Sequence, residues 1–139
     1  RRAVLSASSN SYIDRNVKQG KKYTYKVRAY NNGIFGRFSS EKKVYRLKTL
    51  TNIRVKNTSG RRAAVLWKKK TYATTYQVKY AANPSFNKAR KVSANKKNSR
   101  LTTKKLKKKT YYFHIRYSYK KGGVKSWSAW SKVKKIKIR

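Results

Sequence analysis

The stretch that decides the fold is YYFHIRYSYKKGGVKSWSAWSKVKKIKI, residues 111–138. In its first half, apolar or aromatic side chains occupy every second position and more polar side chains occupy the positions between them. The first set is Tyr111, Phe113, Ile115, Tyr117 and Tyr119, and the second set is Tyr112, His114, Arg116 and Ser118. After a turn at Gly122-Gly123, Ile136 and Ile138 alternate with charged residues. This pattern predicts a half-buried antiparallel β-hairpin.

An earlier part of the chain repeats this stretch. Residues 21–33, KKYTYKVRAYNNG, match residues 109–123, KTYYFHIRYSYKKGG. The match continues after the turn, where FSSEKKVYRL from Phe38 aligns with WSKVKKIKIR from Trp130. The paired residues include Tyr23 with Tyr111, Tyr25 with Phe113, Val27 with Ile115 and Arg28 with Arg116. Such internal similarity predicts two copies of one module.

The composition favours a folded all-β protein. The chain has 139 residues, which fit one ordinary domain or two small ones, and the repeat favours two. Aromatic residues make up 14% of the chain, so a core is expected despite the charge. Short β-type periods occur throughout, and neither a long helical period nor an apolar run of about 18 residues is present, so no transmembrane segment is expected. The absence of Cys excludes disulfides and thiolate chemistry.

Charge is the dominant feature of the composition. There are 41 Lys and Arg residues against two acids, Asp14 and Glu41, which gives a formal net charge of +39. A compact chain of this mass would expose on the order of 7,500 Å². Its net charges would then lie roughly 14 Å apart, less than two Debye lengths of about 8 Å at physiological salt. Solubility needs a net charge of only about 2 to 8, so a polyanionic partner is favoured over a merely solvated surface.

The residue inventory argues against an enzyme. General acid–base chemistry needs paired carboxylates or a His with a partner, and this chain has one His and two well-separated acids. The sequence offers no set of metal ligands, and its glycines match no phosphate-binding loop, so neither a metal nor a cofactor is expected. His114 is expected to be a neutral, exposed strand residue, because the surrounding cations oppose its protonation.

Further strands are expected between residues 48 and 110. Leu50, Ile53 and Val55 indicate one strand, Ala63, Val65 and Trp67 a second, Tyr76, Val78 and Tyr80 a third, and Val92 a short edge strand. Phe86, in the turn NPSFN, is expected to fold back as a plug. The side chains expected in the core are Trp67, Tyr76, Tyr111, Phe113 and Ile115.

These features resemble a fibronectin type III domain, and the resemblance covers nearly the whole chain. It rests on Trp67 in AAVLWKK, Tyr76 in TYQVKY, and LKKKTYY before the alternating strand. The resemblance implies an immunoglobulin-like β-sandwich of seven short strands, here in tandem modules. It also implies tyrosine-corner pairs, which are Leu106 with Tyr111 and Val17 with Tyr23.

The same resemblance divides the chain into two unequal parts. Residues 1–47 match only the last three strands of a module, whereas residues 48–139 match a complete module. The sequence SYIDRNVKQGKKYTYKVRAY, from Ser11, is especially similar to tandem type III modules of exported Gram-positive bacterial surface proteins. This similarity implies a secreted or cell-surface location. A short, stiff linker is expected from Leu47, because the junction is not rich in Gly or Pro.

A partial module would leave the inner faces of Tyr23, Tyr25 and Val27 uncovered, and exposed apolar faces of that kind invite pairing. Three explanations stay open. The first module could be incomplete because of proteolysis or because of the segment chosen for expression. Another chain could complete the module by swapping or strand donation, which predicts self-association through residues 1–47. The strands could also rearrange into a single sheet.

The sequence WSAWS, residues 127–131, resembles the WSxWS box that precedes the last strand in type III modules of cytokine receptors. The resemblance implies a cation–π ladder in which the indoles of Trp127 and Trp130 stack with Arg116 of the neighbouring strand. The functional alternative is a stacking platform for bases or sugar rings.

Lysines gather in the expected turns and on outward strand positions. The residues expected to bind a polyanion are Lys68, Lys69, Lys70, Lys104, Lys105, Lys107, Lys108, Lys109, Arg116, Lys120 and Lys121. A glycosaminoglycan, a teichoic acid or a nucleic acid would fit, because sequence-independent contact needs charge density rather than a code. The alternative function is a structural spacer or a self-assembling surface unit. A deliberately supercharged variant is a third explanation of the composition.

Overall fold

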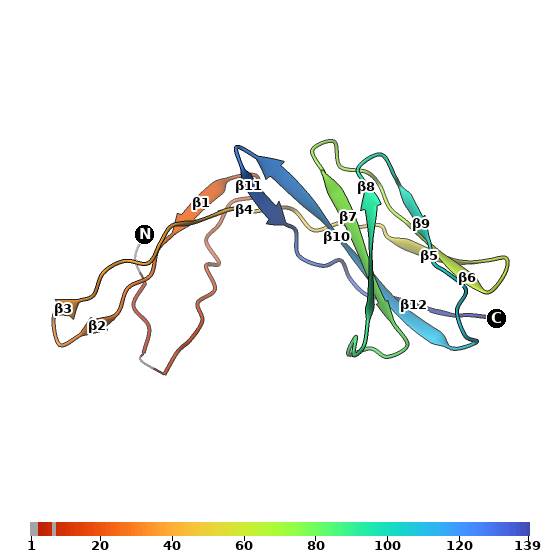
Figure 1. Cartoon of the computed structure of the whole chain (residues 1–139), viewed down its shortest axis with the longest axis horizontal. Coiled ribbons are helices and arrows are strands. Elements are labelled where there is room, and N and C mark those ends of the chain that lie inside the picture. Colours follow the sequence, from red (N-terminus) through yellow and green to blue (C-terminus); the bar gives the residue numbers. More distant parts are fainter. Residues whose placement is uncertain (1–2, 7) are drawn as a thin grey trace.

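A computed structural model describes residues 3–6 and 8–139. All regular elements of these residues are β-strands, which confirms the expected fold class. No helix long and apolar enough to cross a membrane occurs among them. The molecule is elongated, and the described residues before Lys48, here called the arm, extend from one end of a β-sandwich (Figure 1).

Residues 48–139 form two antiparallel sheets. One sheet has the order β5 (Arg54–Thr58), β6 (Arg62–Leu66) and β9 (Arg100–Thr102). The other has the order β8 (Arg90–Asn95), β7 (Thr75–Ala81), β10 (Thr110–Lys121) and β11 (Val124–Trp127), and β12 (Lys134–Lys137) also pairs with β10. Counting β11 and β12 as one interrupted strand gives the seven strands that the resemblance implies.

The predicted hairpin is confirmed, although its second strand is split into β11 and β12. Between the two strands, Ser128 donates its backbone N–H to the Tyr117 carbonyl, while its hydroxyl accepts the Tyr117 N–H at 3.2 Å. Ser131 makes the same pair of bonds with Ile115. Because a side-chain oxygen takes the place of the backbone carbonyl, this segment stays attached to β10 without strand geometry.

The core lies between the two sheets and is centred on β10. Phe113, Ile115 and Tyr117 of β10 are fully buried, as is Val65 of the facing sheet. Of the residues expected in the core, Trp67, Tyr76, Phe113 and Ile115 are buried and Tyr111 is partly buried. Each large apolar side chain removed from water contributes roughly 1.5–3 kcal/mol, so the sandwich has a stabilising core despite its charge.

Two predicted details differ from the structure. β5 begins only at Arg54, and Leu50 and Ile53 are buried ahead of it, so they join the core without joining a sheet. Phe86 does not plug the core. Its ring stacks instead on His114, which alternates with core residues along β10 and therefore faces outward.

Only the first tyrosine corner closes with a hydrogen bond. The hydroxyl of Tyr23 accepts the backbone N–H of Lys18 at 2.7 Å. In the sandwich, Leu106 is buried and Tyr111 is partly buried, but the Tyr111 hydroxyl has no hydrogen-bond partner among the described residues. The turn that precedes Tyr111 is one residue shorter than the turn that precedes Tyr23, and this difference explains the missing bond.

The arm is a ribbon without a second layer. β1 (Lys22–Tyr25) pairs with β4 (Lys42–Tyr45), and β2 (Tyr30–Asn31) pairs with β3 (Ile34–Phe35). The repeat of the first strand of the hairpin predicts one continuous strand here, but it is interrupted between β1 and β2. At the interruption Ser39 bonds to Val27 through the same hydroxyl arrangement as in the sandwich. β10 stays continuous at this point because β7 supports its other edge, and the described part of the arm has no such neighbour.

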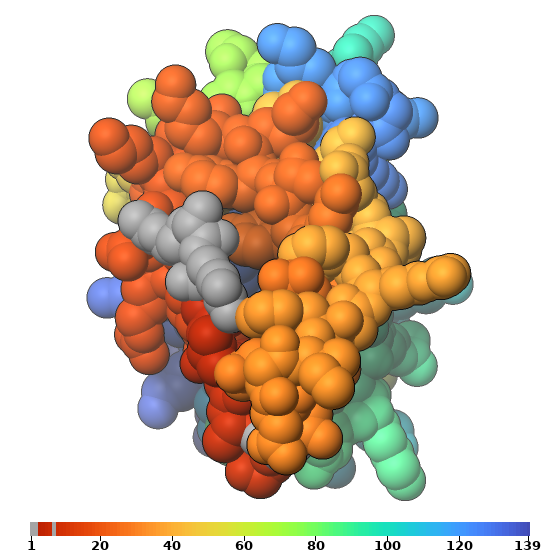
Figure 2. All heavy atoms as spheres, turned by 90° about the vertical axis from the view of Figure 1, so that its left-hand side faces the viewer, coloured from red at the N-terminus to blue at the C-terminus, as the bar shows by residue number. Residues whose placement is uncertain are grey.

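The inner face of the arm is largely uncovered. Of the twelve large apolar side chains that are exposed among the described residues, nine lie in the arm. They are Val4, Leu5, Tyr12, Ile13, Val27, Tyr30, Ile34, Phe35 and Phe38. Of these, Phe35 and Phe38 stack on Arg28 and do not belong to the inner face. A groove of about 440 Å³ lies along this face, lined by residues that include Tyr12, Tyr23 and Tyr25. Figure 2 shows this end of the molecule, where the red and orange segments of the arm lie in front of the sandwich.

The junction between the arm and the sandwich is well packed. Leu47 and Leu50 are buried in the sandwich core. The Tyr45 N–H donates to the Ser126 hydroxyl at 2.8 Å, and the Tyr117 hydroxyl donates to the Lys48 carbonyl at 2.9 Å. Burial raises the pKa of the Tyr117 hydroxyl, which therefore keeps its proton and remains a donor. These contacts agree with the stiff linker that the sequence predicts.

Candidate functional site

Six side chains form a continuous stack, here called the ladder, on the outward face of the sheet that contains β10. In order they are Phe86, His114, Trp130, Arg116, Trp127 and Lys125. The His114 centroid lies 4.1 Å from that of Phe86 and 4.2 Å from that of Trp130, and both ring pairs are within 9° of parallel. The Arg116 Cζ lies 4.4 Å from the Trp130 centroid and 4.3 Å from that of Trp127. The structure thus places Arg116 between the two indoles and extends the stack at both ends.

Local geometry explains how the ladder forms. On β10, His114 and Arg116 face outward because Phe113, Ile115 and Tyr117 face the core. The indoles of Trp127 and Trp130 come from the segment that the two serine hydroxyls attach to β10. Each cation stacked on an aromatic ring contributes roughly 0.5–1 kcal/mol at an exposed site and more where it is desolvated, so the ladder also stabilises this sheet.

Arg116 is held in one orientation. Its Nε and Nη2 donate to Oε1 of Gln77 at 3.0 and 2.7 Å, and Gln77 lies directly opposite Arg116 in the register of β7 and β10. The indoles of Trp127 and Trp130 lie over the guanidinium. Burial lowers the pKa of Arg116, but a guanidinium titrates so far above neutrality that it keeps its charge.

His114 is not the exposed residue that the sequence predicts. Phe86 and Trp130 stack on its ring, and the residue is only 9% exposed. Burial, together with the charges of Lys79 and Arg116, lowers the pKa of His114 to about 4. The ring is therefore neutral at physiological pH and stacks as an aromatic group rather than as a cation. Its Nε2 is buried with no hydrogen-bond partner among the described residues.

The ladder leaves no indole face open for a ligand. Trp130 is stacked between His114 and Arg116, and Trp127 has Arg116 and Lys125 over its ring. A base or a sugar ring would have to displace one of these side chains before it could stack. The geometry therefore favours a structural role for the two indoles over the stacking platform that the sequence left open.

The residues predicted to bind a polyanion lie in three places. Lys68–Lys70, in the loop before β7, and Lys120–Lys121, the last residues of β10, lie at the end of the sandwich where β7 begins and β10 ends. The five lysines between residues 104 and 109 lie at the opposite end, where β10 begins (Figure 1). Arg116 lies between these ends, in the ladder. All the lysines are exposed except Lys70, which is half-buried. The structure does not bring the set together into one patch.

A different set of cations shares the outward face of the ladder. Residues directly opposite in adjacent strands point to the same face, and the register pairs Lys79 with Lys91 and with His114, Lys120 with Lys125, and Lys135 with Tyr112. Together with Arg116, these pairs place six cations in or beside the ladder, on a surface here called the ladder face: Lys79, Lys91, Arg116, Lys120, Lys125 and Lys135. Lys137, opposite Thr110, lies on the same side of the sheet but farther along it. Lys79, Lys91 and Lys125 are not among the cations that the sequence clusters indicated. The sequence signal that could have revealed them is that each alternates with inward-facing residues along its strand, which predicts an outward position.

The arm carries a shorter version of the ladder. The Arg28 Cζ lies 3.8 Å from the Phe35 centroid and 4.4 Å from the Phe38 centroid. The two phenylalanines have the same three-residue spacing as the tryptophans of the sandwich, and Ser39 follows them. The repeat aligned Arg28 and Phe38 with their counterparts but did not identify Phe35, which the spacing could have revealed.

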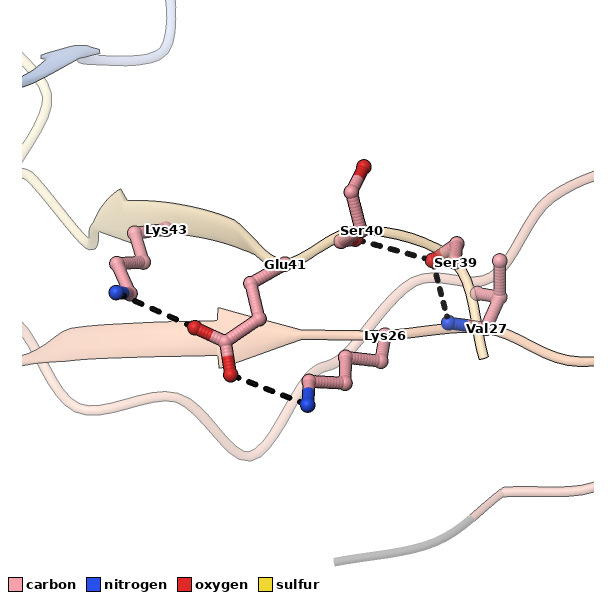
Figure 3. Close-up of polar contacts among 6 residues, drawn as sticks. All are labelled: Lys26, Val27, Ser39, Ser40, Glu41 and Lys43. Atoms are coloured by element: carbon pink, nitrogen blue, oxygen red, sulfur yellow. Dashed lines mark hydrogen bonds and ion pairs between the residues drawn. The ribbon is translucent and has the colours of Figure 1, made fainter. Parts of the chain in front are cut away.

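Both acidic residues of the chain lie in the arm. Glu41 accepts from Lys26 and Lys43, each at 3.2 Å (Figure 3), and these ammonium groups lower the pKa of its carboxyl. Asp14 accepts the Tyr25 hydroxyl at 3.1 Å. Residues 48–139 contain no acidic side chain. In the described part of the chain, no group of three or more His, Cys, Asp or Glu side chains could hold a metal ion.

Comparison with known proteins gives structural similarity alone, because no family model and no curated protein matches the chain. A chicken CNTN1 segment, domains FN1–FN3, is similar with a TM-score of 0.56 and 22% identity over 92% of this chain and 46% of that one. A two-domain fibronectin type III segment from chicken tenascin has a TM-score of 0.57 and 19% identity over 94% and 72%. A cytokine receptor complex has a TM-score of 0.58 and 17% identity over 74% and 60%.

The chain therefore spans about half the length of the CNTN1 structure that it matches. The similarity agrees with the two sheets described above, β5–β6–β9 facing β8–β7–β10–β11. From the sheet order and these matches together, we conclude that the chain has the fibronectin type III fold.

Proposed function

We propose that the chain is a non-enzymatic binding module that engages polyanions through distributed Lys and Arg contacts, at the cell surface or outside the cell. The observation that carries this proposal is the charge balance of the sandwich. Residues 48–139 have no acidic side chain, and most of their lysines are exposed, at both ends and on the ladder face. A surface of one sign attracts and concentrates a polymer of the opposite sign.

The shape of the molecule makes the charge less dense than a compact fold would. The accessible surface is 10662 Å², above the roughly 7,500 Å² expected of a compact chain of this mass. Shared among 39 net charges, it gives roughly 270 Å² for each charge, and a mean spacing of roughly 17 Å, about two Debye lengths at physiological salt. Self-repulsion is therefore weaker than the composition suggests, and a long polyanion would contact several cations at once.

Charge removal at one end tests whether the contacts are distributed. Replacing Lys107, Lys108 and Lys109 together with Gln should weaken binding to heparin by less than about tenfold at physiological salt, because many other cations remain. The matched control replaces Lys68, Lys69 and Lys70, at the opposite end, and should have a similar effect. Isothermal titration calorimetry measures both. Complete loss of binding in one triple variant, with little change in the other, would show a localised site and contradict the distributed mode.

The second candidate function is a self-assembling or spacer unit in which another chain completes the arm. The nine exposed apolar side chains of the arm favour this candidate. It predicts an oligomer that persists near 1 M salt, where the Debye length is about 3 Å and repulsion between chains is screened. Analytical ultracentrifugation should then show that Val27→Lys, at a position 71% exposed in the arm, yields monomers. The control Val133→Lys, in the sandwich, should not. A wild-type monomer at high salt would rule out this candidate.

A further inference from the structure

The guanidinium of Arg116 has donors that the protein does not use. Gln77 takes the Nε donor and one donor of Nη2 through a single oxygen. A guanidinium has five N–H donors, so Nη1 keeps two and Nη2 keeps one, and none of these has a partner among the described residues. The edge formed by Nη1 and Nη2 presents two parallel donors, the geometry that receives two oxygens of a carboxylate, sulfate or phosphate group.

The same side chain is a cation without a protein counter-ion. It is half-buried under two indoles, so its charge is partly desolvated, and this burial lowers its pKa. No acidic side chain exists in residues 48–139. Glu41 is paired with Lys26 and Lys43, and Asp14 accepts from Tyr25, both within the arm. An anion that compensates Arg116 must therefore come from outside the sandwich.

We propose that the Nη1–Nη2 edge of Arg116 is an oxyanion site that receives one sulfate group of a sulfated polysaccharide. This inference rests on the proposed function and assigns to it a shaped site and a ligand class. Lys79 and Lys125 flank the site, since their Nζ atoms lie 6.0 Å from the Trp130 centroid and 5.1 Å from the Trp127 centroid. They would contact neighbouring sulfates of the same polymer.

Rigidity distinguishes this site from the surrounding lysines. A free lysine loses rotamer entropy when it is immobilised by a ligand, whereas the Arg116 side chain is already held by Gln77 and the two indoles. Its planar fork also selects an oxyanion of matching geometry, which an ammonium group does not. The site should therefore add affinity that charge alone does not provide.

The ladder also selects between classes of polyanion. Single-stranded nucleic acids gain much of their affinity from bases stacked on aromatic side chains. Both indoles of the ladder are already stacked, Trp130 with His114 and Arg116, and Trp127 with Arg116 and Lys125. A sulfated polysaccharide needs no ring face, because its charged groups lie outside its sugar rings. The observations thus favour the polysaccharide over a single-stranded nucleic acid.

The test is Gln77→Glu. This change places a carboxylate against the guanidinium of Arg116 and supplies the missing counter-ion from within the protein. The matched control is Thr102→Glu, an identical charge change at an exposed position of β9 in the other sheet. Affinity for a heparin-derived hexasaccharide, measured by calorimetry at about 150 mM salt, should fall by about tenfold or more in Gln77→Glu and by less than about threefold in Thr102→Glu. Equal losses in the two variants would overturn the site.

A second variant distinguishes loss of the site from a folding defect caused by Gln77→Glu. Arg116→Lys keeps the charge but removes the paired donors, and it should lose about fivefold or more in affinity for the hexasaccharide. Thermal unfolding of each variant shows whether the sandwich is intact. Unchanged affinity in a folded Arg116→Lys variant would also overturn the site, because it would show that charge alone suffices.

Two further probes distinguish a failure of this inference from a failure of the proposed function on which it rests. Polyphosphate and an oligo-dT strand replace the hexasaccharide as probes. Gln77→Glu should affect the oligo-dT strand less than the sulfated probe, and polyphosphate about as much, because the guanidinium fork receives phosphate as well as sulfate. An oligo-dT strand more sensitive than the hexasaccharide would overturn the ligand class. If the wild type bound none of the three probes, the proposed function itself would fail. Wild-type binding that Gln77→Glu and Thr102→Glu reduced equally would leave that function standing and remove only the site.

Discussion

The affinity of the chain for duplex DNA is expected to fall by about three orders of magnitude between 50 and 200 mM salt, as for a protein that neutralises about six phosphates. Six is the number of cations on the ladder face, Lys79, Lys91, Arg116, Lys120, Lys125 and Lys135. Each neutralised phosphate releases condensed counter-ions, and added salt opposes this release. A plot of log affinity against log salt should be linear, with a slope near −5.

Polylysine of similar charge is the control for this measurement. A flexible polycation contacts a duplex with as many charges as can reach it, so it should show a slope at least as steep. A slope near −1 would show that the chain makes only one or two ionic contacts, and would contradict the distributed mode. Fluorescence anisotropy of a labelled duplex gives the affinities over the whole salt range.

Folding stability is expected to fall as the pH is lowered from about 6.5 to about 4, because of His114. In the unfolded chain His114 has an ordinary pKa near 6.5, whereas in the folded protein its pKa is about 4. Above this window His114 is neutral in both the folded and the unfolded state, so the full free energy of unfolding is present there. Within the window the unfolded state binds a proton that the folded state does not, and the free energy of unfolding drops by up to about 3 kcal/mol. Below pH 4 the loss is complete.

Urea unfolding at a series of pH values measures this effect. The control is His114→Phe, which keeps an aromatic ring between Phe86 and Trp130 and cannot titrate. Its stability should be nearly flat between pH 6.5 and 4.5. The carboxyl of Glu41, whose pKa is lowered by Lys26 and Lys43, titrates in both proteins and cancels in the comparison. Parallel pH profiles for the two proteins would show that His114 does not titrate as its burial requires.

The arm and the sandwich share one structural feature of the repeat, an arginine stacked between two aromatic side chains. Arg28 with Phe35 and Phe38 in the arm repeats the arrangement of Arg116 in the sandwich, although phenylalanines replace the indoles. The arm forms this stack without a second sheet, because the stack needs only one hairpin and the Ser39 hydroxyl. The ladder is therefore a property of the hairpin, whereas the core is a property of the whole sandwich.

Several features were determined by the sequence alone. The alternation from Tyr111 to Tyr119 predicts β10 and its buried side chains, because the period of two in a strand depends only on local backbone geometry. The pairing of Arg116 with Trp127 and Trp130 follows the WSAWS resemblance, and the hairpin brings these residues together. The all-β class follows from the same short-range patterns.

Other features were decided only by the tertiary structure. The burial of His114 depends on Phe86, which folds over it from a loop between β7 and β8. The ladder face combines cations of β8, β7, β10, β11 and β12, whose order no local pattern specifies. The lysine clusters lie at opposite ends because antiparallel strands return successive loops to alternate ends of a sandwich. Periodicity assigns each residue to a face of its own strand, but long-range pairing decides which strands become neighbours, and this decides which charges share a surface.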